Sequence, residues 1–175
     1  IVIPAYNEAH TITQLLEHVL ALNVPGAEKE IIVVDDGSAD ATPEILKQYE
    51  GRVRVLTHPK NRGKGAAVRT GFAVATGEYV VVQDGDLEYD PRDIAKMFAL
   101  ALQKNLPVVY GSRRLGLPGQ HMRRGAWYYY LGGLLITWTA NLLYGLRLTD
   151  EPTCYKMIRK DVLARLHLQS EGFEF

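Results

Sequence analysis

Short apolar runs rich in β-branched residues recur along the chain and are separated by longer, more polar segments. The runs are almost continuously apolar, whereas a strand with one face in water would alternate apolar and polar residues. Continuous runs of this length are typical of strands that helices cover on both faces. We therefore predict five buried strands, at residues 1–3, 31–34, 53–56, 79–83 and 108–110.

The segments between these runs have the spacing of amphipathic helices. Apolar residues recur three or four positions apart within 12–20, 66–72 and 94–102. Pro43 and Pro91 follow acidic residues, as is common in the first turn of a helix. Strands that alternate with helices predict an α/β fold with a doubly wound, mainly parallel sheet flanked by helices. In such sheets, ligands bind beyond the carboxyl ends of the strands.

The pattern changes after residue 112. Residues 112–125 are rich in glycine and arginine and predict a loop, and a final helix is predicted near 160–166. The uncharged stretch 131–146 is shorter than the roughly 20 residues that a transmembrane helix needs. We expect most of it to be a buried helix that covers the sheet. The aromatic residues just before it favour a position of one part at a membrane interface.

Composition limits the possible classes of protein. The chain has 175 residues, of which 20 are basic and 20 acidic, so one domain spanning 1–175 with no net charge is expected. A neutral chain does not suggest a generally basic nucleic-acid-binding protein. The single cysteine, Cys154, excludes an internal disulfide and favours a reducing compartment. The chain starts inside an apolar run without methionine, and we expect a catalytic core truncated at both ends.

Polar clusters follow three of the predicted strands. They are residues 4–8 (PAYNE), 35–38 (DDGS) and 83–86 (QDGD). Each cluster alone is also typical of an ordinary turn, because Asp, Asn and Gly are turn formers. The carboxyl ends of parallel strands meet at one edge of a sheet, so we expect the three clusters to form a ligand site.

The third cluster carries two carboxylates with one glycine between them. In an extended segment Asp84 and Asp86 would point the same way, and Gly85 would not obstruct a ligand between them. Carboxylate oxygens suit Mg²⁺ or Mn²⁺, which commonly share their coordination with phosphate oxygens. The location behind a buried strand strengthens an otherwise weak Asp-x-Asp signal.

Other nucleotide-binding motifs are absent or incomplete in the sequence. There is no P-loop, and residues 63–68 (GKGAAV) begin like a dinucleotide fingerprint but have Val68 at the third small position. Two interpretations of this stretch remain open: the start of a helix, or a phosphate-facing loop that carries Arg62 and Lys64. The histidines show no metal-ligand spacing, and we predict surface or loop positions for His10, His18, His58, His121 and His167.

Several linked motifs resemble those of one family. They are IVIPAYNE (1–8), IIVVDDGSADAT (31–42), the stretch from NRGKG to LEYDP (61–91), GSRR (111–114) and TDEPTCYKMIRKDVL (149–163). In this order and spacing they resemble the inverting family 2 glycosyltransferases, and the last two resemble the dolichyl-phosphate mannose synthase-like subgroup. The resemblance covers essentially the whole chain and implies the GT-A fold, which is Rossmann-like.

The resemblance also implies a nucleotide-diphosphate-sugar donor and a divalent metal ion. It assigns the diphosphate and the metal, Mg²⁺ or Mn²⁺, to Asp84, Gly85 and Asp86, with Asp86 as the principal ligand. Glu88 stands where relatives often have a glutamine that reaches the metal, so it is a third candidate ligand. The residues that the resemblance places around the nucleoside are Pro4, Ala5, Tyr6, Glu8, Val34 and Asp36.

The acceptor decides which other residues act. If it is a saccharide hydroxyl, a base is needed, and the resemblance makes Asp150 the positional candidate. If it is a lipid phosphate, its second pKa of about 6 leaves it ionised, and cations position it instead. The resemblance assigns phosphate contacts to Arg113 and, in the next loop, to Arg123 and Arg124. The arginine-rich loop before an apolar segment favours a polyprenyl phosphate, with Asp150 then ordering its loop.

Other classes and details stay open at this point. A catalytically silent module that binds a nucleotide sugar would not need the acidic and basic set intact. A sugar nucleotidyltransferase would need a glycine-rich, basic loop after the first strand, where this chain has PAYNE. The donor is GDP-mannose, UDP-glucose or another nucleotide sugar. We expect a cytoplasmic protein that associates with the cytoplasmic face of a membrane.

Overall fold

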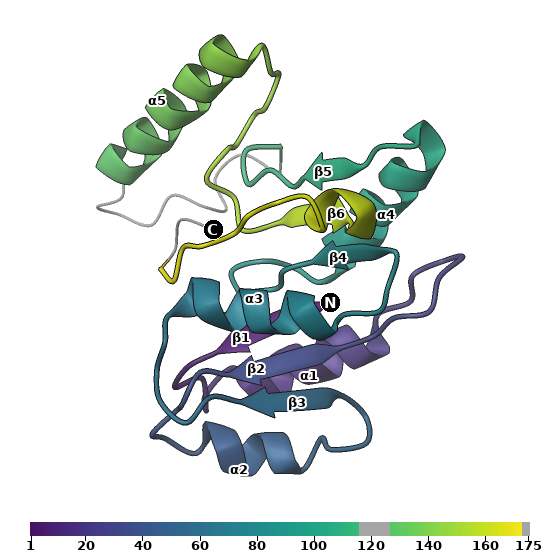
Figure 1. Ribbon diagram of the computed structural model, residues 1–175, viewed down its shortest axis with the longest axis vertical. Coiled ribbons are helices and arrows are strands. Elements are labelled where there is room, and N and C mark those ends of the chain that lie inside the picture. The colour runs from purple at the N-terminus through teal and green to yellow at the C-terminus, as the bar shows by residue number, and fades with distance from the viewer. Residues whose placement is uncertain (116–126, 173–175) are drawn as a thin grey trace.

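Helices and strands alternate in the computed structural model, which describes residues 1–115 and 127–172 (Figure 1). The elements in chain order are β1 (Val2–Ala5), α1 (Ile12–Ala21), β2 (Ile32–Asp35), α2 (Thr42–Lys47), β3 (Arg54–Thr57), α3 (Lys64–Val74), β4 (Tyr79–Val81), α4 (Arg92–Lys104), β5 (Val108–Tyr110), α5 (Trp127–Tyr144), β6 (Lys156–Arg159) and α6 (Lys160–Leu163). Each strand predicted from the sequence is present with small differences at its ends. The α/β class is therefore confirmed.

The strands form two three-stranded groups that meet at β1. β1, β2 and β3 are parallel, with Val2 opposite Ile32, while β6 lies between β4 and β5 and is antiparallel to both. A parallel bridge joins Val2 to Val82, and the amide of Gln83 donates to the carbonyl of Val2 at 2.9 Å. Among the named strands β6 alone runs against the others, so the predicted mainly parallel sheet is confirmed.

β6 was not predicted from the sequence, which indicated only a helix near 160–166. Its four residues have one fully buried side chain, Met157, so they lack the continuous apolar run of the other strands. Pairing with β4 on one side and β5 on the other supplies the backbone hydrogen bonds that stabilise it. The helix that follows, α6, has only four residues.

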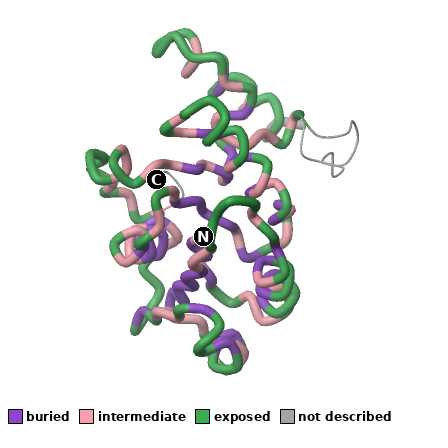
Figure 2. The backbone as a smooth tube through the Cα atoms, turned by 90° about the vertical axis from the view of Figure 1, so that its right-hand side faces the viewer, coloured by how far each residue is buried: buried purple, intermediate pink, exposed green. Residues whose placement is uncertain are grey.

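Helices cover both faces of the parallel strands. α1 and α2 pack on one face against Ile3 and Val33, and α3 packs on the other face against Val2 and Val34. α3 lies so close to β1 that a Cβ atom at Gly71 would come within 2.4 Å of a Val2 methyl group. α4 covers the strands β4, β6 and β5. Figure 2 shows the buried residues concentrated in this layered body.

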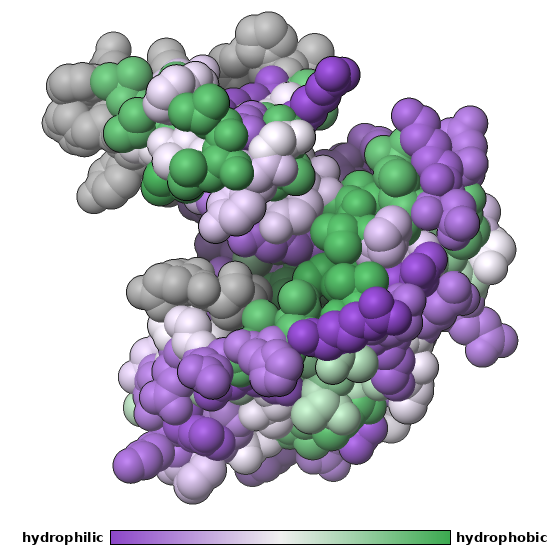
Figure 3. Space-filling model, turned by 45° about the horizontal axis from the view of Figure 1, so that its top comes forward, coloured by the Kyte–Doolittle hydropathy of each residue, from purple (hydrophilic) through white to green (hydrophobic). Residues whose placement is uncertain are grey.

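α5 stands outside the layered body (Figure 1). We predicted a buried helix that covers the sheet, and this is wrong: Leu135, Trp138, Leu142 and Leu143 are each more than half exposed. Green apolar surface gathers on this part of the molecule in Figure 3. Its attachment is polar, through hydrogen bonds to the segment 146–151. Within the described part of the chain, no helix is long and apolar enough to cross a membrane.

Candidate active site

The three polar clusters lie side by side at the carboxyl edge of the strands, as predicted. The amide of Asp36 donates to the carbonyl of Ala5 at 2.8 Å, which joins the first two clusters. Glu8 lies over Gly85, because a Cβ atom added to that glycine would be 3.0 Å from Glu8 Cγ. A side chain at position 85 would therefore push Glu8 away. This close approach brings the first and third clusters together.

Hydrogen bonds fix the loops after β1 and β2 to each other. The amide of Asn7 donates to Ser38 Oγ and the amide of Ala39 donates to Asn7 Oδ1, both at 2.9 Å. The amide of Glu8 donates to Thr42 Oγ1 at 2.9 Å. Asn7 adopts a left-handed conformation with φ of 57°, which asparagine tolerates better than most residues. The two loops therefore form one continuous wall, with the ring of Tyr6 half-exposed at its rim.

Three residues predicted to lie around the nucleoside are buried, and their contact with it stays a prediction. The side chains of Ala5 and Val34 belong to the hydrophobic cores on the two faces of the sheet, because neighbouring strand residues point to opposite faces. Asp36 is 2% exposed. Pro4 is half-buried, and Tyr6 and Glu8 remain at the edge of the sheet. Their contact with a nucleoside stays a prediction.

Asp36 holds the loop that precedes α3. Its Oδ1 lies 2.6 Å from His58 Nδ1, and its two oxygens accept hydrogen bonds from the amides of Arg62 and Gly63 at 2.8 to 3.1 Å. His58 Nε2 lies 2.9 Å from Thr70 Oγ1 on α3. His58 was predicted as a surface or loop residue, and it lies in a loop but is buried. The signal that was missed is its place directly after a strand.

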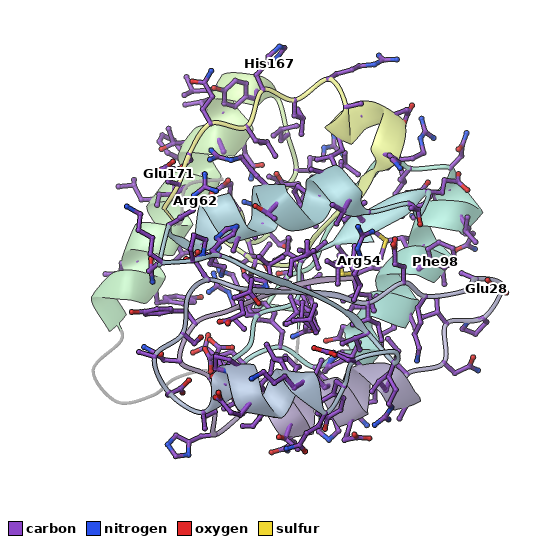
Figure 4. All side chains as sticks on the ribbon, turned by 60° about the horizontal axis from the view of Figure 1, so that its bottom comes forward. Glu28, Arg54, Arg62, Phe98, His167 and Glu171 are labelled. Atoms are coloured by element: carbon purple, nitrogen blue, oxygen red, sulfur yellow. The ribbon has the colours of Figure 1, made fainter. Side chains whose placement is uncertain are left out.

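The stretch 63–68 is the start of α3. The amide of Gly63 is bound by Asp36, and the amide of Gly65 donates to the carbonyls of Glu171 and Gly172 at 3.0 and 2.8 Å. Arg62 and Glu171 lie near each other beside this end of the helix (Figure 4). Because chain carbonyls already occupy the Gly65 amide, the structure favours the helix-start interpretation over an open phosphate-facing loop.

The carboxylates of the third cluster point in different directions. Residues 85 and 86 form a turn, so the extended geometry that we assumed is wrong. Asp84 is mostly buried and its Oδ1 lies 2.5 Å from Lys64 Nζ, whereas Asp86 and Glu88 are exposed. The amide of Glu88 donates to Asp86 Oδ1 at 3.0 Å. In the described ranges no three Asp, Glu, His or Cys side chains form a group that could hold a metal ion.

The predicted trio of Asp84, Asp86 and Glu88 is therefore not brought together as a ligand set. Carboxylates are still the donors that Mg²⁺ and Mn²⁺ prefer, and Asp86 presents one at the open edge. The exposed carboxylate of Asp86 fits a hard divalent cation, whereas Asp84 is paired with Lys64 in this structure. The assignment of Asp86 as a metal ligand stays a prediction.

A buried polar network supports the third cluster from behind. The Tyr155 hydroxyl donates to Gln83 Oε1 at 2.5 Å, and Gln83 Nε2 donates to the carbonyl of Asp84 at 3.1 Å. The amide of Cys154 donates to the Tyr89 hydroxyl at 3.1 Å, and the rings of Tyr89 and Tyr155 pack at 4.6 Å. This network could not be predicted from the sequence, because its hydrogen-bonded residues are about 70 positions apart in the chain.

Arg113, which is partly exposed, forms an ion pair with the buried Asp150. Asp150 is 1% exposed, and its oxygens accept hydrogen bonds from Arg113 Nε at 2.8 Å, Nη2 at 2.9 Å and the backbone amide at 3.0 Å. Burial opposes ionisation of Asp150, but the bonds from Arg113 outweigh it and hold the pKa of the carboxyl below its usual value. The same bonds raise the pKa of the Arg113 guanidinium. The predicted base is thus a partner of Arg113 with no exposed oxygen.

Arg113 also lines a groove of about 1410 Å³ beside the edge of the sheet. The groove lies between the end of α1, the loop 87–91 and α4, and Glu88 and Tyr89 contribute to it. The side chain of Arg113 is 38% exposed in spite of its ion pair. Arg123 and Arg124, the other predicted phosphate contacts, lie outside the described residues.

Solved structures of similar fold identify this sheet, with acidic and polar loops gathered at one edge, as the GT-A fold of glycosyltransferases. The same fold occurs in glucosyl-3-phosphoglycerate synthase from Mycobacterium tuberculosis, crystallised with Mn²⁺, UDP and glucosyl-3-phosphoglycerate. That structure matches 94% of this chain and 57% of its own, with a TM-score of 0.68 and 27% identity.

The chain belongs to glycosyl transferase family 2, whose model matches residues 1–166. The dodecaprenyl-phosphate galacturonate synthase of Rhizobium johnstonii is 30% identical over the whole chain and 52% of its own length. A dolichyl-phosphate beta-glucosyltransferase of Trichomonas vaginalis is 43% identical over 49% of the chain and 28% of its own length. The chain thus spans about half or less of these relatives.

Because Arg113 lowers the pKa of Asp150, we expect the stabilisation that this pair gives the fold to depend on pH. Replacement of Asp150 by Asn is expected to lower the free energy of unfolding by about 1.5 to 3 kcal/mol at pH 7. The pKa of Asp150 is depressed in the folded state, so its contribution is present above the unfolded value of about 3.9 and is lost as pH falls through the folded value. The difference between the two proteins should therefore shrink only below about pH 4.

Chemical denaturation of both proteins between pH 3 and 7 measures this difference. Asp93→Asn is the matched control, since Asp93 pairs with Lys96 at the surface and should contribute little at any pH. An Asp150→Asn variant as stable as this control at pH 7 would show that the ion pair does not stabilise the fold.

Proposed function

We propose that this chain is the catalytic part of an inverting transferase that moves a hexose from a nucleotide-diphosphate sugar to a polyprenyl phosphate. The observation that carries the choice of acceptor is the Arg113–Asp150 pair. Asp150, the candidate base, is 1% exposed and bound by a guanidinium. A saccharide hydroxyl needs a base within hydrogen-bond reach, whereas an ionised phosphate does not.

The donor is assigned to the edge formed by the three clusters. The structurally similar glucosyl-3-phosphoglycerate synthase was crystallised with UDP and Mn²⁺. This supports a nucleotide-diphosphate sugar and a divalent cation for the present chain. Asp86 would hold the cation, with Mg²⁺ or Mn²⁺ as candidates. When bound, such a cation neutralises the charge that develops on the leaving diphosphate. The wall made by residues 4–8 and 38–42 would lie beside the nucleoside.

The acceptor side follows from the basic residues. The names of both curated relatives refer to lipid-phosphate acceptors, dodecaprenyl phosphate and dolichyl phosphate. Arg113, held in place by Asp150, presents its exposed part to the groove beside the edge and would orient the acceptor phosphate. An oxygen of this phosphate attacks the anomeric carbon as the bond from that carbon to the nucleoside diphosphate breaks. The configuration inverts because attack comes from the opposite face.

Transfer by purified full-length protein tests this proposal. GDP- and UDP-sugars would be supplied with Mn²⁺ and with a short polyprenyl phosphate, the matching polyprenol or a free saccharide. Product is expected with the phosphate alone, and its rate should fall as pH drops through about 6, where the acceptor phosphate gains a proton. Transfer to the saccharide and not to the polyprenyl phosphate would establish the alternative, a hydroxyl acceptor with Asp150 as base.

We also propose that α5 lies against the membrane that holds such an acceptor. Its exposed face carries Leu135, Trp138, Leu142 and Leu143, a larger apolar surface than a soluble protein usually leaves uncovered. Tyr130 and Tyr144, exposed near the two ends of α5, suit the interface between lipid and water. This position of α5 would keep the acceptor phosphate close to Arg113. The next residue, Arg114, donates a hydrogen bond to the carbonyl of Thr149, which follows α5 closely in the chain.

Binding to lipid vesicles tests whether α5 contacts a membrane or is simply exposed to solvent. The double variant Trp138→Glu, Leu142→Glu is expected to bind phosphatidylcholine–phosphatidylglycerol vesicles roughly tenfold or more weakly in a sedimentation assay. Leu102→Glu on α4 is the matched control, because Leu102 is 50% exposed but lies outside α5. Equal binding by the double variant and the control would contradict a membrane contact through α5.

A further inference from the structure

Lys64, Asp84 and Cys154 form a mostly buried cluster at the carboxyl edge. Lys64 Nζ lies 2.5 Å from Asp84 Oδ1 and 3.4 Å from Cys154 Sγ. The thiol of Cys154 donates to the same Asp84 oxygen at 2.9 Å. The side chains of Lys64 and Asp84 are only 19% and 13% exposed. One oxygen of a candidate metal ligand therefore already accepts two hydrogen bonds from the protein.

The positive charge at Asp84 comes from Lys64. Burial and the Asp84 carboxylate raise the pKa of the Cys154 thiol to about 12, so the thiol donates a hydrogen bond without charge. The pKa of Lys64 is also raised: burial works against its charge, but the Asp84 carboxylate favours it. The ammonium and the carboxylate thus neutralise each other in a partly desolvated site.

Hydrogen bonds on both sides hold the backbone around Lys64. The amides of Gly63 and Gly65 on either side are bound by Asp36 and by the carbonyls of Glu171 and Gly172. A Cβ atom at Gly65 would come within 2.6 Å of the carbonyl oxygen of Ser170. The start of α3 therefore has no room to shift. The four-carbon stem of a lysine can still swing its ammonium to a different partner.

We propose that Lys64 is a positioning residue that neutralises Asp84 in the free protein and competes with a divalent cation for this carboxylate. This inference rests on the proposed function, because it concerns the edge at which we place the donor diphosphate. A metal ion on Asp84 Oδ1, at about 2.1 Å, would lie within about 5 Å of the ammonium. Two cations at that distance repel each other, so the binding of either one disfavours the other.

The competition gives Lys64 a second partner. An ammonium displaced from Asp84 lies next to the edge that is assigned to the diphosphate, and the diphosphate is the anion that it would meet there. The metal and the nucleotide would then load together more readily than the metal alone. The metal-free protein keeps its acidic edge neutral at Asp84, while the carboxylates of Asp86 and Glu88 remain exposed.

Mn²⁺ binding to the full-length protein, measured by calorimetry without donor or acceptor, tests the competition. The Lys64→Met variant is expected to bind Mn²⁺ about tenfold or more tightly than the wild type, because a like charge near the site is removed. Lys96→Met is the matched control: it removes one positive charge from the surface of α4 and should change affinity little. Unchanged or weaker binding by Lys64→Met would overturn the proposal.

Two further measurements keep the result interpretable. In the Asp84→Asn background the Lys64→Met change should have no effect on Mn²⁺ affinity, whereas an equal gain there would overturn a competition through Asp84. In the wild type, modification of Lys64 by an amine-selective reagent, followed by mass spectrometry, should increase when Mn²⁺ is added. No increase would contradict displacement of the ammonium, even if a variant fails to fold.

These readouts are independent of sugar transfer. Competition between Mn²⁺ and Lys64 without any transfer to a polyprenyl phosphate would refute the proposed reaction and leave the role of Lys64 standing. Transfer to the polyprenyl phosphate with no competition would refute the role of Lys64 alone.

Discussion

Val2 joins the two groups of strands, and the candidate site depends on this junction. It is opposite Ile32 on one side, and on the other side it pairs with Val82 and accepts a hydrogen bond from the amide of Gln83. β1 is therefore held between β2 and β4, and the three loops that follow these strands leave the sheet next to one another. Gly71 allows α3 to pack directly against Val2, so this junction is also closely covered. A change of register here would separate the loops that carry the polar clusters.

Three carboxylates near this edge are each matched to a group of the protein that bears or can bear positive charge. Asp36 is bound by His58, Asp84 by Lys64 and Asp150 by Arg113. Each pair joins a loop to a distant part of the chain, and each carboxylate is buried or mostly buried. Burial without such a partner would destabilise the charged form strongly. Asp86 differs from all three because it is exposed, so it is the carboxylate best placed to meet a ligand.

The alternation of strands and helices could be predicted from the sequence because apolar runs report burial directly. The convergence of the clusters could also be predicted, since it follows from parallel strands. β6 could not, because its stability comes from two neighbouring strands and not from its own four residues. α5 was predicted to be buried from its apolar composition, but composition does not say which surface a helix meets.

Within the site, residue types were predicted better than their partners. The pairing of Lys64 with Asp84 and Cys154 joins positions up to 90 residues apart, which no local pattern reports. Ala5, Val34 and Asp36 were assigned to a nucleoside pocket by position in a motif, but strand alternation and the loop before α3 bury them. The three hydrogen bonds that Asp150 accepts from Arg113 could not be predicted either, and its role as a base stays untested.

In the proposed reaction Asp86 holds a metal ion at the carboxyl edge, and a nucleoside diphosphate binds there together with this ion. Titration of UDP and GDP into the full-length protein with Mn²⁺ measures this directly. We predict that the wild type binds at least one of them, and that Asp86→Asn lowers the affinity about tenfold or more, because it loses a charged ligand for the cation. Equal affinity of the two proteins for the nucleotide in the presence of Mn²⁺ would contradict the claim.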